Sequence, residues 1–240
     1  MKKIKRLDIN CDLGEGLGND KDLIPFLDTC NIACGGHAGN RDTVLSTMRL
    51  AKEQSVKIGA HPSFPDSQNF GRKEMEIEPS ILKNSLIHQL DLFFEIAVKE
   101  NMNVHHIKPH GALYNKAAKD ENTARLILEL IVEKYTGTIL YCPPNSMMES
   151  LAANYAVAIH REVFADRTYQ DDLSLTNRKE LNALLTTPDE VISHLSLIFE
   201  RKSIRSLSGK IFPIQADTVC VHGDNPAALE ILKSIHFNFG

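Results

Sequence analysis

The fold is indicated most clearly by Val104-His105-His106-Ile107-Lys108-Pro109-His110-Gly111-Ala112-Leu113-Tyr114-Asn115. Here a β-type run ends among titratable side chains, and the chain passes into an amphipathic segment at 117–135. Pro109 has no backbone N–H, so a regular central strand would end at Lys108. Titratable groups at such a junction are costly in a core but useful in a site, because burial and nearby charges shift their pKa values. Taken alone, the stretch fits a solvated strand end equally well.

The same arrangement recurs, because short β-type runs alternate with helix-type segments along the chain. The predicted strands are residues 7–11, 29–34, 56–60, 104–108, 138–142, 157–163 and 218–221. The predicted helices are residues 41–54, 79–101, 117–135, 146–154, 188–201 and 226–235. Strict alternation implies parallel strands joined by right-handed crossovers, which gives either a doubly wound sheet or a closed barrel.

The positions of the polar residues decide between sheet and barrel. Each β-type run is followed by groups able to do chemistry: Asp12 and Glu15, His37, His61, Lys108 and His110, Asn145, Glu162 with Asp166 and Arg167, and His222 with Asp224. An open sheet collects ligands only at its topological switch point, whereas all strand ends of a barrel converge on one mouth. We therefore predict an α/β fold with a seven-stranded (β/α) barrel, a site at its C-terminal mouth, and an elaborated loop at 164–185 over that mouth.

Length and composition bound the class of protein. The 240 residues contain no linker rich in Gly and Ser, so a single domain over 1–240 is expected. A net charge of −4 without a basic run argues against nucleic acid or a membrane surface as the main partner. The basic N-terminus is followed by Asp8, Asn10 and Asp12, where a signal peptide would be apolar. Five cysteines, an odd number beside apolar runs, suit buried thiols in a reducing cytoplasm.

Six motifs, in order and spread over nearly the whole chain, resemble those of the LamB/YcsF family. They are DINCDLGE at 8–15, NIACGGHAG at 31–39, IGAHPSFPD at 58–66, IKPHGALYN at 107–115, FADRTY at 164–169 and CVHGDNP at 220–226. The resemblance implies a seven-stranded (β/α) barrel similar to the sugar deacetylases. It also implies ATP-dependent opening of 5-oxo-L-proline to L-glutamate, performed together with two partner subunits.

The sequence departs from the family pattern at a few positions. Gly36 stands where Phe is usual and Asn40 where Asp is usual. The loop after Tyr169 lacks the expected Gly, and Leu181 and Asn182 replace a later Gly-Ala pair. Because the loop changes lie over the predicted mouth, they bear on the substrate more than on the fold.

Chemistry assigns roles to the strand-end residues. A five-membered lactam is an unactivated amide, so its opening requires activation, a base that prepares water, and a group that stabilises the oxyanion. The chain has no Gly-x-x-x-x-Gly-Lys-Ser/Thr loop, which suggests that a partner subunit handles the ATP. Asp12 or Glu162 could act as the base, and spacing does not distinguish them. Lys108, His110 and Arg167 could hold an oxyanion or a phosphoryl group.

We accordingly predict two sets of site residues. The catalytic set is Asp12, Lys108, His110 and Glu162. The substrate-binding set is Asn10, Glu15, His37, His61, Tyr114, Asp166, Arg167, His222 and Asp224. The remaining histidines are expected to be structural: at least one of His105 and His106, together with His88, His160, His194 and His236.

A divalent metal is a competing use of part of this set. Asp12, His37 and His61 lie at three successive strand ends, and sugar deacetylases of similar fold use such a triad. The alternative is that these groups bind the polar substrate directly. We expect a metal-free or weakly metal-binding site, because this triad contains no close ligand pair such as His-x-x-x-His. Two further classes stay open: a stand-alone metal-dependent amidohydrolase or deacetylase, and a non-catalytic subunit of a complex.

Overall fold

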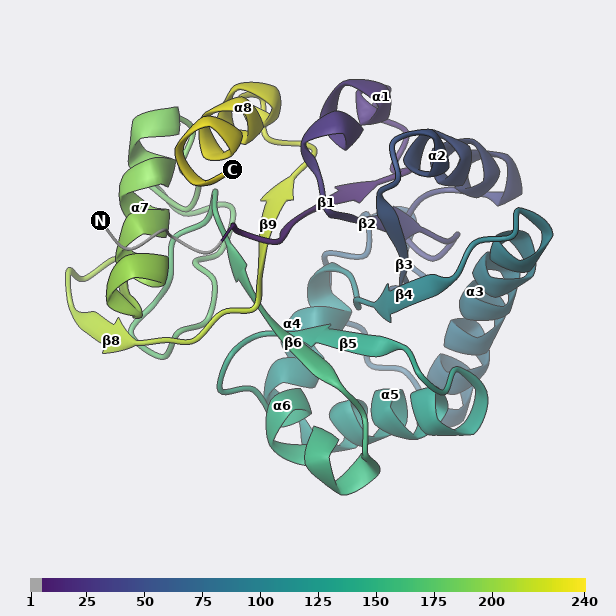
Figure 1. The fold of residues 1–240 in the computed structure, drawn as a ribbon. Coiled ribbons are helices and arrows are strands. Elements are labelled where there is room, and N and C mark those ends of the chain that lie inside the picture. Colours follow the sequence, from purple (N-terminus) through teal and green to yellow (C-terminus); the bar gives the residue numbers. More distant parts are fainter. Residues whose placement is uncertain (1–5) are drawn as a thin grey trace.

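Seven parallel strands close into a barrel in the computed structural model, which describes residues 6–240 (Figure 1). The strands are β1 (Ile9–Leu13), β2 (Thr29–Ala33), β3 (Lys57–His61), β4 (Val104–Ile107), β5 (Ile139–Cys142), β6 (Ile159–Phe164) and β9 (Thr218–His222). Each strand pairs with its successor, and β9 closes the ring by pairing with both β6 and β1. The predicted seven-stranded barrel is confirmed. The predicted single domain over 1–240 stays a prediction, and residues 1–5 lie outside the described part.

Helices surround the barrel on its outer face (Figure 1). They are α1 (Asp20–Leu23), α2 (Arg41–Glu53), α3 (Pro79–Lys99), α4 (Gly111–Lys119), α5 (Glu121–Lys134), α6 (Met147–Ala152), α7 (Pro188–Arg201) and α8 (Ala228–Phe239), with short 3-10 turns η1 (Ile24–Phe26) and η2 (Ala153–Tyr155). No helix within residues 6–240 is both long and apolar enough to span a membrane.

The prediction of a single helix at 117–135 was wrong. Two helices cover residues 111–134, α4 and α5, with a break at Asp120. Asp120 separates them with an extended backbone, and its carboxylate accepts a hydrogen bond of 2.8 Å from the backbone N–H of Thr123. An acceptor at this position caps a new helix, so α5 begins where α4 ends. α4 starts earlier than predicted, at Gly111, and so follows directly on the segment at 108–110 that leaves β4 (Val104–Ile107).

An antiparallel hairpin that the sequence did not predict lies between α7 and β9. It consists of β7 (Ser203–Arg205) and β8 (Ile211–Pro213), strands too short for a periodic signal. The hairpin turn contacts the elaborated loop at 164–185, because Ser206, Ser208 and Lys210 all bind the carboxylate of Asp171. The hairpin therefore braces the loop at one end of the barrel.

A polar layer fills the barrel beneath its mouth. The amide of Asn31 donates to the side chain of Asn10 at 2.8 Å, and His106 Nε2 binds the oxygen of Asn31. The ring of His106 stacks on Tyr141 with 3.9 Å between centroids. Gly59 makes room for this ring, since a Cβ there would lie 2.1 Å from His106 Nε2. These contacts confirm that His106 is a packed, hydrogen-bonded residue.

Candidate active site

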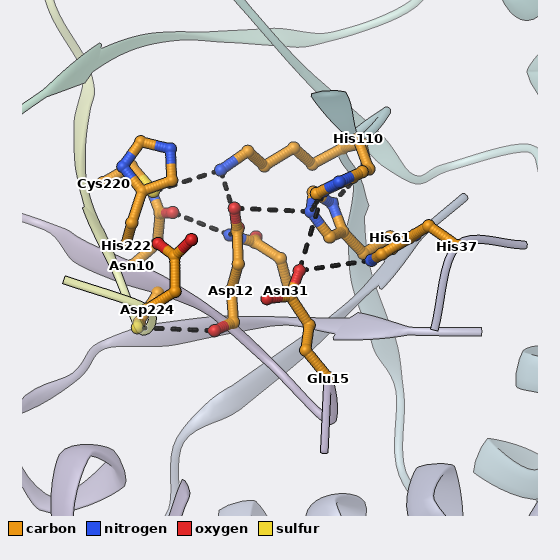
Figure 2. A network of polar contacts seen from close by, with 12 residues as sticks. Asn10, Asp12, Glu15, Asn31, His37, His61, His110, Cys220, His222 and Asp224 are labelled. Atoms are coloured by element: carbon orange, nitrogen blue, oxygen red, sulfur yellow. Dashed lines mark hydrogen bonds and ion pairs between the residues drawn. The ribbon is translucent and has the colours of Figure 1, made fainter. Parts of the chain in front are cut away.

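The C-terminal strand ends converge as predicted, and most of their polar side chains form one contiguous network (Figure 2). Asp12 lies at its centre, near the end of β1, and is 5% exposed. Cys220 and His222 lie to one side of Asp12, whereas Glu15, His37, His61 and His110 lie to the other (Figure 2). We call the group of Lys108, Asp12, Glu162 and Cys220 the lysine centre, and the group of Glu15, His37, His61 and His110 the histidine cluster.

The lysine centre is built around the Lys108 ammonium, whose side chain is 2% exposed. Its Nζ lies 2.8 Å from Asp12 Oδ1, 3.0 Å from Glu162 Oε1 and 3.1 Å from Cys220 Sγ. Burial opposes the charge, but the neighbouring Asp12, Cys220 and Glu162 outweigh it and hold the pKa of Lys108 well above its usual value. The ammonium therefore stays charged. Lys108 lies directly after β4, and Pro109 follows it.

Asp12 is an ionised carboxylate whose Oδ1 holds two donors. Its Oδ1 accepts 2.7 Å and 2.8 Å hydrogen bonds from Asn31 Nδ2 and Lys108 Nζ, and its Oδ2 lies 3.4 Å from His61 Nε2. Burial would raise the pKa of Asp12, but His61 and Lys108 together lower it well below the usual range. A carboxylate held in this state orients its neighbours and accepts a proton poorly.

Glu162 differs from Asp12 because it keeps free acceptor capacity. Its side chain is fully buried near the end of β6, yet within the described residues neither of its oxygens accepts a well-aligned hydrogen bond. The buried hydroxyl of Tyr114 also has no partner there. Burial and the nearby Glu162 raise the pKa of Tyr114 well above its usual value, so the phenol is protonated. Unpaired buried polar atoms are costly, and this pair is suited to hold a water molecule or a polar substrate group.

The histidine cluster consists of Glu15, His37, His61 and His110. His37 Nε2 lies 3.2 Å from Glu15 Oε1, and His110 Nδ1 lies 2.9 Å from His61 Nε2. The rings of His37 and His110 stack with 3.7 Å between centroids. Burial is the main cause that lowers the pKa of both His37 and His110, so both rings are held neutral.

These four side chains could hold a metal ion, since one donor atom from each lies within 4.8 Å of all the others. The set differs from the predicted triad of Asp12, His37 and His61. Asp12 is turned toward Lys108, and Glu15 and His110 stand in its place. Gly111 supports this geometry with a φ of +53°. A Cβ there would lie 2.7 Å from the carbonyl of Gly71, in the loop that approaches the start of α4.

His222 forms a second, oriented pair with Asp166. Its Nδ1 lies 2.8 Å from Asp166 Oδ1, and Asn225 donates a 3.0 Å hydrogen bond to Asp166 Oδ2. Burial opposes ionisation of Asp166, but His222 and Asn225 outweigh it and lower its pKa. The carboxylate thus accepts the Nδ1–H of His222, which leaves Nε2 as the nitrogen available at the mouth.

Two arginines that the sequence did not single out close over the mouth. Arg72 and Arg178 both contact Asp224 Oδ2, at 2.5 Å and 2.7 Å. The contacts join the loop after β3, the loop after β6 and the loop after β9. The only sequence signal for Arg178 was its place in the predicted mouth loop at 164–185, and Arg72 gave none.

Other predicted site residues lie outside this network or, like Asn10, in the layer beneath it, where Asn31 joins Asn10 to Asp12 (Figure 2). The guanidinium of Arg167 donates to the carbonyl oxygens of Ala183 and Thr176, so it holds the mouth loop together and forms no ion pair with Asp166. Asn10 lies in the layer beneath, bonded to Thr218 at 2.9 Å. Asn145 is exposed at the end of β5 and does not join the network.

The predicted structural histidines lie outside the network. His88 and His236 are exposed on α3 and α8, His160 stacks on Tyr141, and His194 Nε2 lies 3.3 Å from the carbonyl of Phe164.

The departures at Gly36 and Asn40 have local explanations. A Cβ at Gly36 would lie 2.3 Å from Gln89 Oε1 and 2.4 Å from Ser63 Oγ, so here Gln89 fills the space beside residue 36. Gln89 exchanges two 2.9 Å hydrogen bonds with the backbone of Ser63. Asn40 caps α2 by accepting hydrogen bonds from two backbone N–H groups, a role that Asp fills equally well.

Comparisons with known proteins agree with this architecture. The A subunit of 5-oxoprolinase from Staphylococcus haemolyticus is 39% identical over 236 residues, or 96% of this chain and 94% of the relative. The A subunit of 5-oxoprolinase from Pyrococcus abyssi is 37% identical over 235 residues, or 96% and 92%. The crystal structure of a lactam utilization protein from Thermus thermophilus is 32% identical, with a TM-score of 0.89 over 96% of this chain and 94% of that chain. The family model of the LamB/YcsF family matches residues 7–239, and the chain belongs to that family.

Proposed function

We propose that this chain is the A subunit of an ATP-dependent 5-oxoprolinase, a hydrolase that opens the lactam of 5-oxo-L-proline to give L-glutamate. Relatives named as the A subunit of 5-oxoprolinase match nearly the whole chain, and a structural relative is named a lactam utilization protein. The single observation on this chain that carries the proposal is the lysine centre. It sets a buried ammonium, Lys108, beside the buried carboxylate of Glu162 at the mouth of the barrel.

ATP supplies the activation that the lactam needs. Phosphorylation of the lactam oxygen, with ADP as the leaving group, would convert a poor electrophile into one that water can attack. Breaking the C–N bond then gives an acyl phosphate, and a second water releases phosphate to give glutamate. The chain has no Gly-x-x-x-x-Gly-Lys-Ser/Thr loop, and for this reason we assign the nucleotide to one of two partner subunits. The relatives are named as one lettered subunit of their enzyme, which supports assembly with partners.

Lys108 and Glu162 act on the ring carbon in this proposal. The Lys108 ammonium stabilises negative charge as it develops on the lactam or phosphoryl oxygen, and it does so in a site shielded from water. Glu162 takes the proton of the attacking water, because neither of its oxygens accepts a well-aligned hydrogen bond, whereas Asp12 Oδ1 already holds two donors and the low pKa of Asp12 makes it a poor base. Asp12 keeps Lys108 in place and charged.

His222 is placed to give a proton to the ring nitrogen as the C–N bond breaks: it would act as the imidazolium, losing the proton on Nε2 and keeping the one on Nδ1. Asp166 fixes the tautomer through Nδ1, so proton exchange occurs at Nε2. Arg72 and Arg178 offer N–H groups beyond those that bind Asp224. We assign them to the substrate carboxylate or to a phosphoryl oxygen, which match the planar donor fork of arginine.

A cytoplasmic location fits this assignment, and the five free, buried cysteines support it. A stand-alone metal-dependent amidohydrolase is the second candidate, and the histidine cluster favours it. The two are separated by assaying glutamate release from 5-oxo-L-proline with the chain alone and with co-expressed partner subunits, each with and without ATP. Release that needs both partners and ATP supports the proposal. Release by the isolated chain without ATP, abolished by chelators, supports the amidohydrolase.

A further inference from the structure

His61 Nε2 and His110 Nδ1 face each other, and the hydrogen bonds of the two rings show which nitrogens carry protons. His61 Nδ1 lies 2.8 Å from the carbonyl oxygen of Lys108, and His110 Nε2 lies 3.0 Å from the carbonyl oxygen of Phe70. A carbonyl oxygen can only accept, so each of these nitrogens must carry the ring proton. In the neutral rings, His61 Nε2 and His110 Nδ1 are therefore both bare lone pairs.

These two bare nitrogens lie only 2.9 Å apart, and both side chains are almost fully buried. Two lone pairs at this separation repel each other, and burial weakens screening by solvent. A positive centre between them would turn the repulsion into attraction. A shared proton would serve these two nitrogens alone, yet two more donor atoms converge on the same place: Glu15 Oε1 and His37 Nε2.

Three separations among the four donor atoms are close to those around a small divalent ion, and all four atoms lie within 4.8 Å of one another. Glu15 Oε1 lies 3.2 Å from His37 Nε2 and 3.7 Å from His110 Nδ1, and the two facing nitrogens are 2.9 Å apart. A tetrahedral zinc ion with bonds of about 2.0–2.1 Å separates its ligand atoms by roughly 3.3 Å. Three imidazoles and one carboxylate are a donor set that suits zinc or a similar transition metal.

The surroundings of the cluster have the form of a metal site as well. Ligating histidines usually donate their second N–H to a backbone carbonyl or a carboxylate, which fixes the ring and raises its basicity. His61 and His110 both do so. Glu15 brings one negative charge, and the Asp12 carboxylate, 3.4 Å from His61 Nε2, adds a second beside the cluster.

We propose that Glu15, His37, His61 and His110 bind one divalent transition-metal ion of the zinc type, with Asp12 outside the ligand set. This revises the expectation of a metal-free or weakly binding site, because ligands from four separate strand ends leave no close pair in the sequence. The proposal concerns binding by this chain and holds whichever reaction the mouth performs.

The test is metal binding by the purified full chain after chelation and dialysis. Zinc is titrated by calorimetry, and cobalt is followed by its visible absorption, which is intense when the ion is tetrahedral. We expect one ion per chain, a tetrahedral cobalt spectrum, and a rise in thermal stability with zinc. The variants Glu15→Gln and His110→Ala should bind zinc about 100-fold or more weakly, since even supporting residues cost 10–100-fold.

Two matched variants make the test specific. His88→Ala removes an exposed histidine of α3 and should bind zinc as the wild type does. Asp12→Asn should retain the ion, and circular dichroism checks that each variant is folded. If His110→Ala does not fold, His37→Ala replaces it, because His37 Nδ1 has no partner in the described residues. The proposal fails if the wild type binds no ion, if Glu15→Gln and the histidine variant bind as the wild type does, or if Asp12→Asn loses the ion while Glu15→Gln keeps it.

Discussion

Both sides of the barrel mouth bury titratable groups, but one side keeps them charged and the other keeps them neutral. The lysine centre keeps the buried Lys108 ammonium and the buried Asp12 carboxylate charged, because Lys108 lies between the carboxylates of Asp12 and Glu162. The histidine cluster buries several rings and keeps them neutral, because burial outweighs the single carboxylate of Glu15. Burial alone thus does not fix the protonation state of a group. The protonation state also depends on the number of opposite charges in contact with the group.

The largest effect is expected from Lys108→Met. This change leaves Asp12 and Glu162 buried without their cation, a loss that typically costs about 3–5 kcal/mol of unfolding free energy. Urea unfolding measures it, and turnover of the complex should be lost. Lys99→Met, which removes a mostly exposed partner of Glu95, is the control and should change stability little. Equal stability of the two variants would show that the lysine centre is not a coupled ionic unit.

His110→Ala probes the histidine cluster. Turnover of the complex should fall by about 10–100-fold while the fold is kept, since a proposed ligand of the histidine cluster is removed and no buried charge is exposed. Steady-state glutamate release and thermal unfolding measure the two effects. His110 has no N–H left for an oxyanion, because Nε2 faces Phe70 and Nδ1 faces His61. Lost stability with unchanged specific activity would make His110 a packing residue.

The pH dependence of stability separates the two sides further. The folded pKa values of His37 and His110 lie below the ordinary 6.5, so below about pH 6.5 the unfolded chain binds protons that the folded chain does not. Stability should therefore fall as the pH drops, by about 1.4 kcal/mol per pH unit for each such histidine, until the folded pKa is reached. His110→Asn in metal-free protein should have a shallower slope in urea titrations between about pH 6.5 and 5. An unchanged slope would contradict a neutral, buried His110.

The smallest effect on stability is expected at the rim of the mouth. Asp171 and Asp172 both lie in the mouth loop, but Asp171 is tied to the hairpin turn by Ser206, Ser208 and Lys210. Asp172 is more exposed and pairs with Lys119 across the surface. Asp172→Lys should therefore weaken coupled activity or partner binding while barely changing the unfolding midpoint. If co-purification with the partners and coupled activity are both unchanged, the loop is not at the interface.

Much of the barrel could be predicted from sequence because strand and helix periods alternate and strand ends collect polar residues. The site was predicted as a set of residues, and the fold brings most of them together at the mouth of the barrel. Its partition was missed, because it depends on side-chain direction: Asp12 turns to Lys108, and Glu15 reaches His37 and His110 instead. Arg72 and the short hairpin were missed because neither leaves a periodic or spacing signal in the sequence.

The central claim is that the lysine centre of this chain opens an ATP-activated lactam together with partner subunits. The most direct measurement compares the wild-type complex with one that carries Glu162→Gln, recording ATP consumption and glutamate release from 5-oxo-L-proline in the same sample. Loss of a general base should lower glutamate release by about 10²–10⁴-fold. The isolated wild-type chain should release none, with or without ATP. Normal glutamate release by the Glu162→Gln complex, or ATP-independent release by the isolated chain, would contradict the claim.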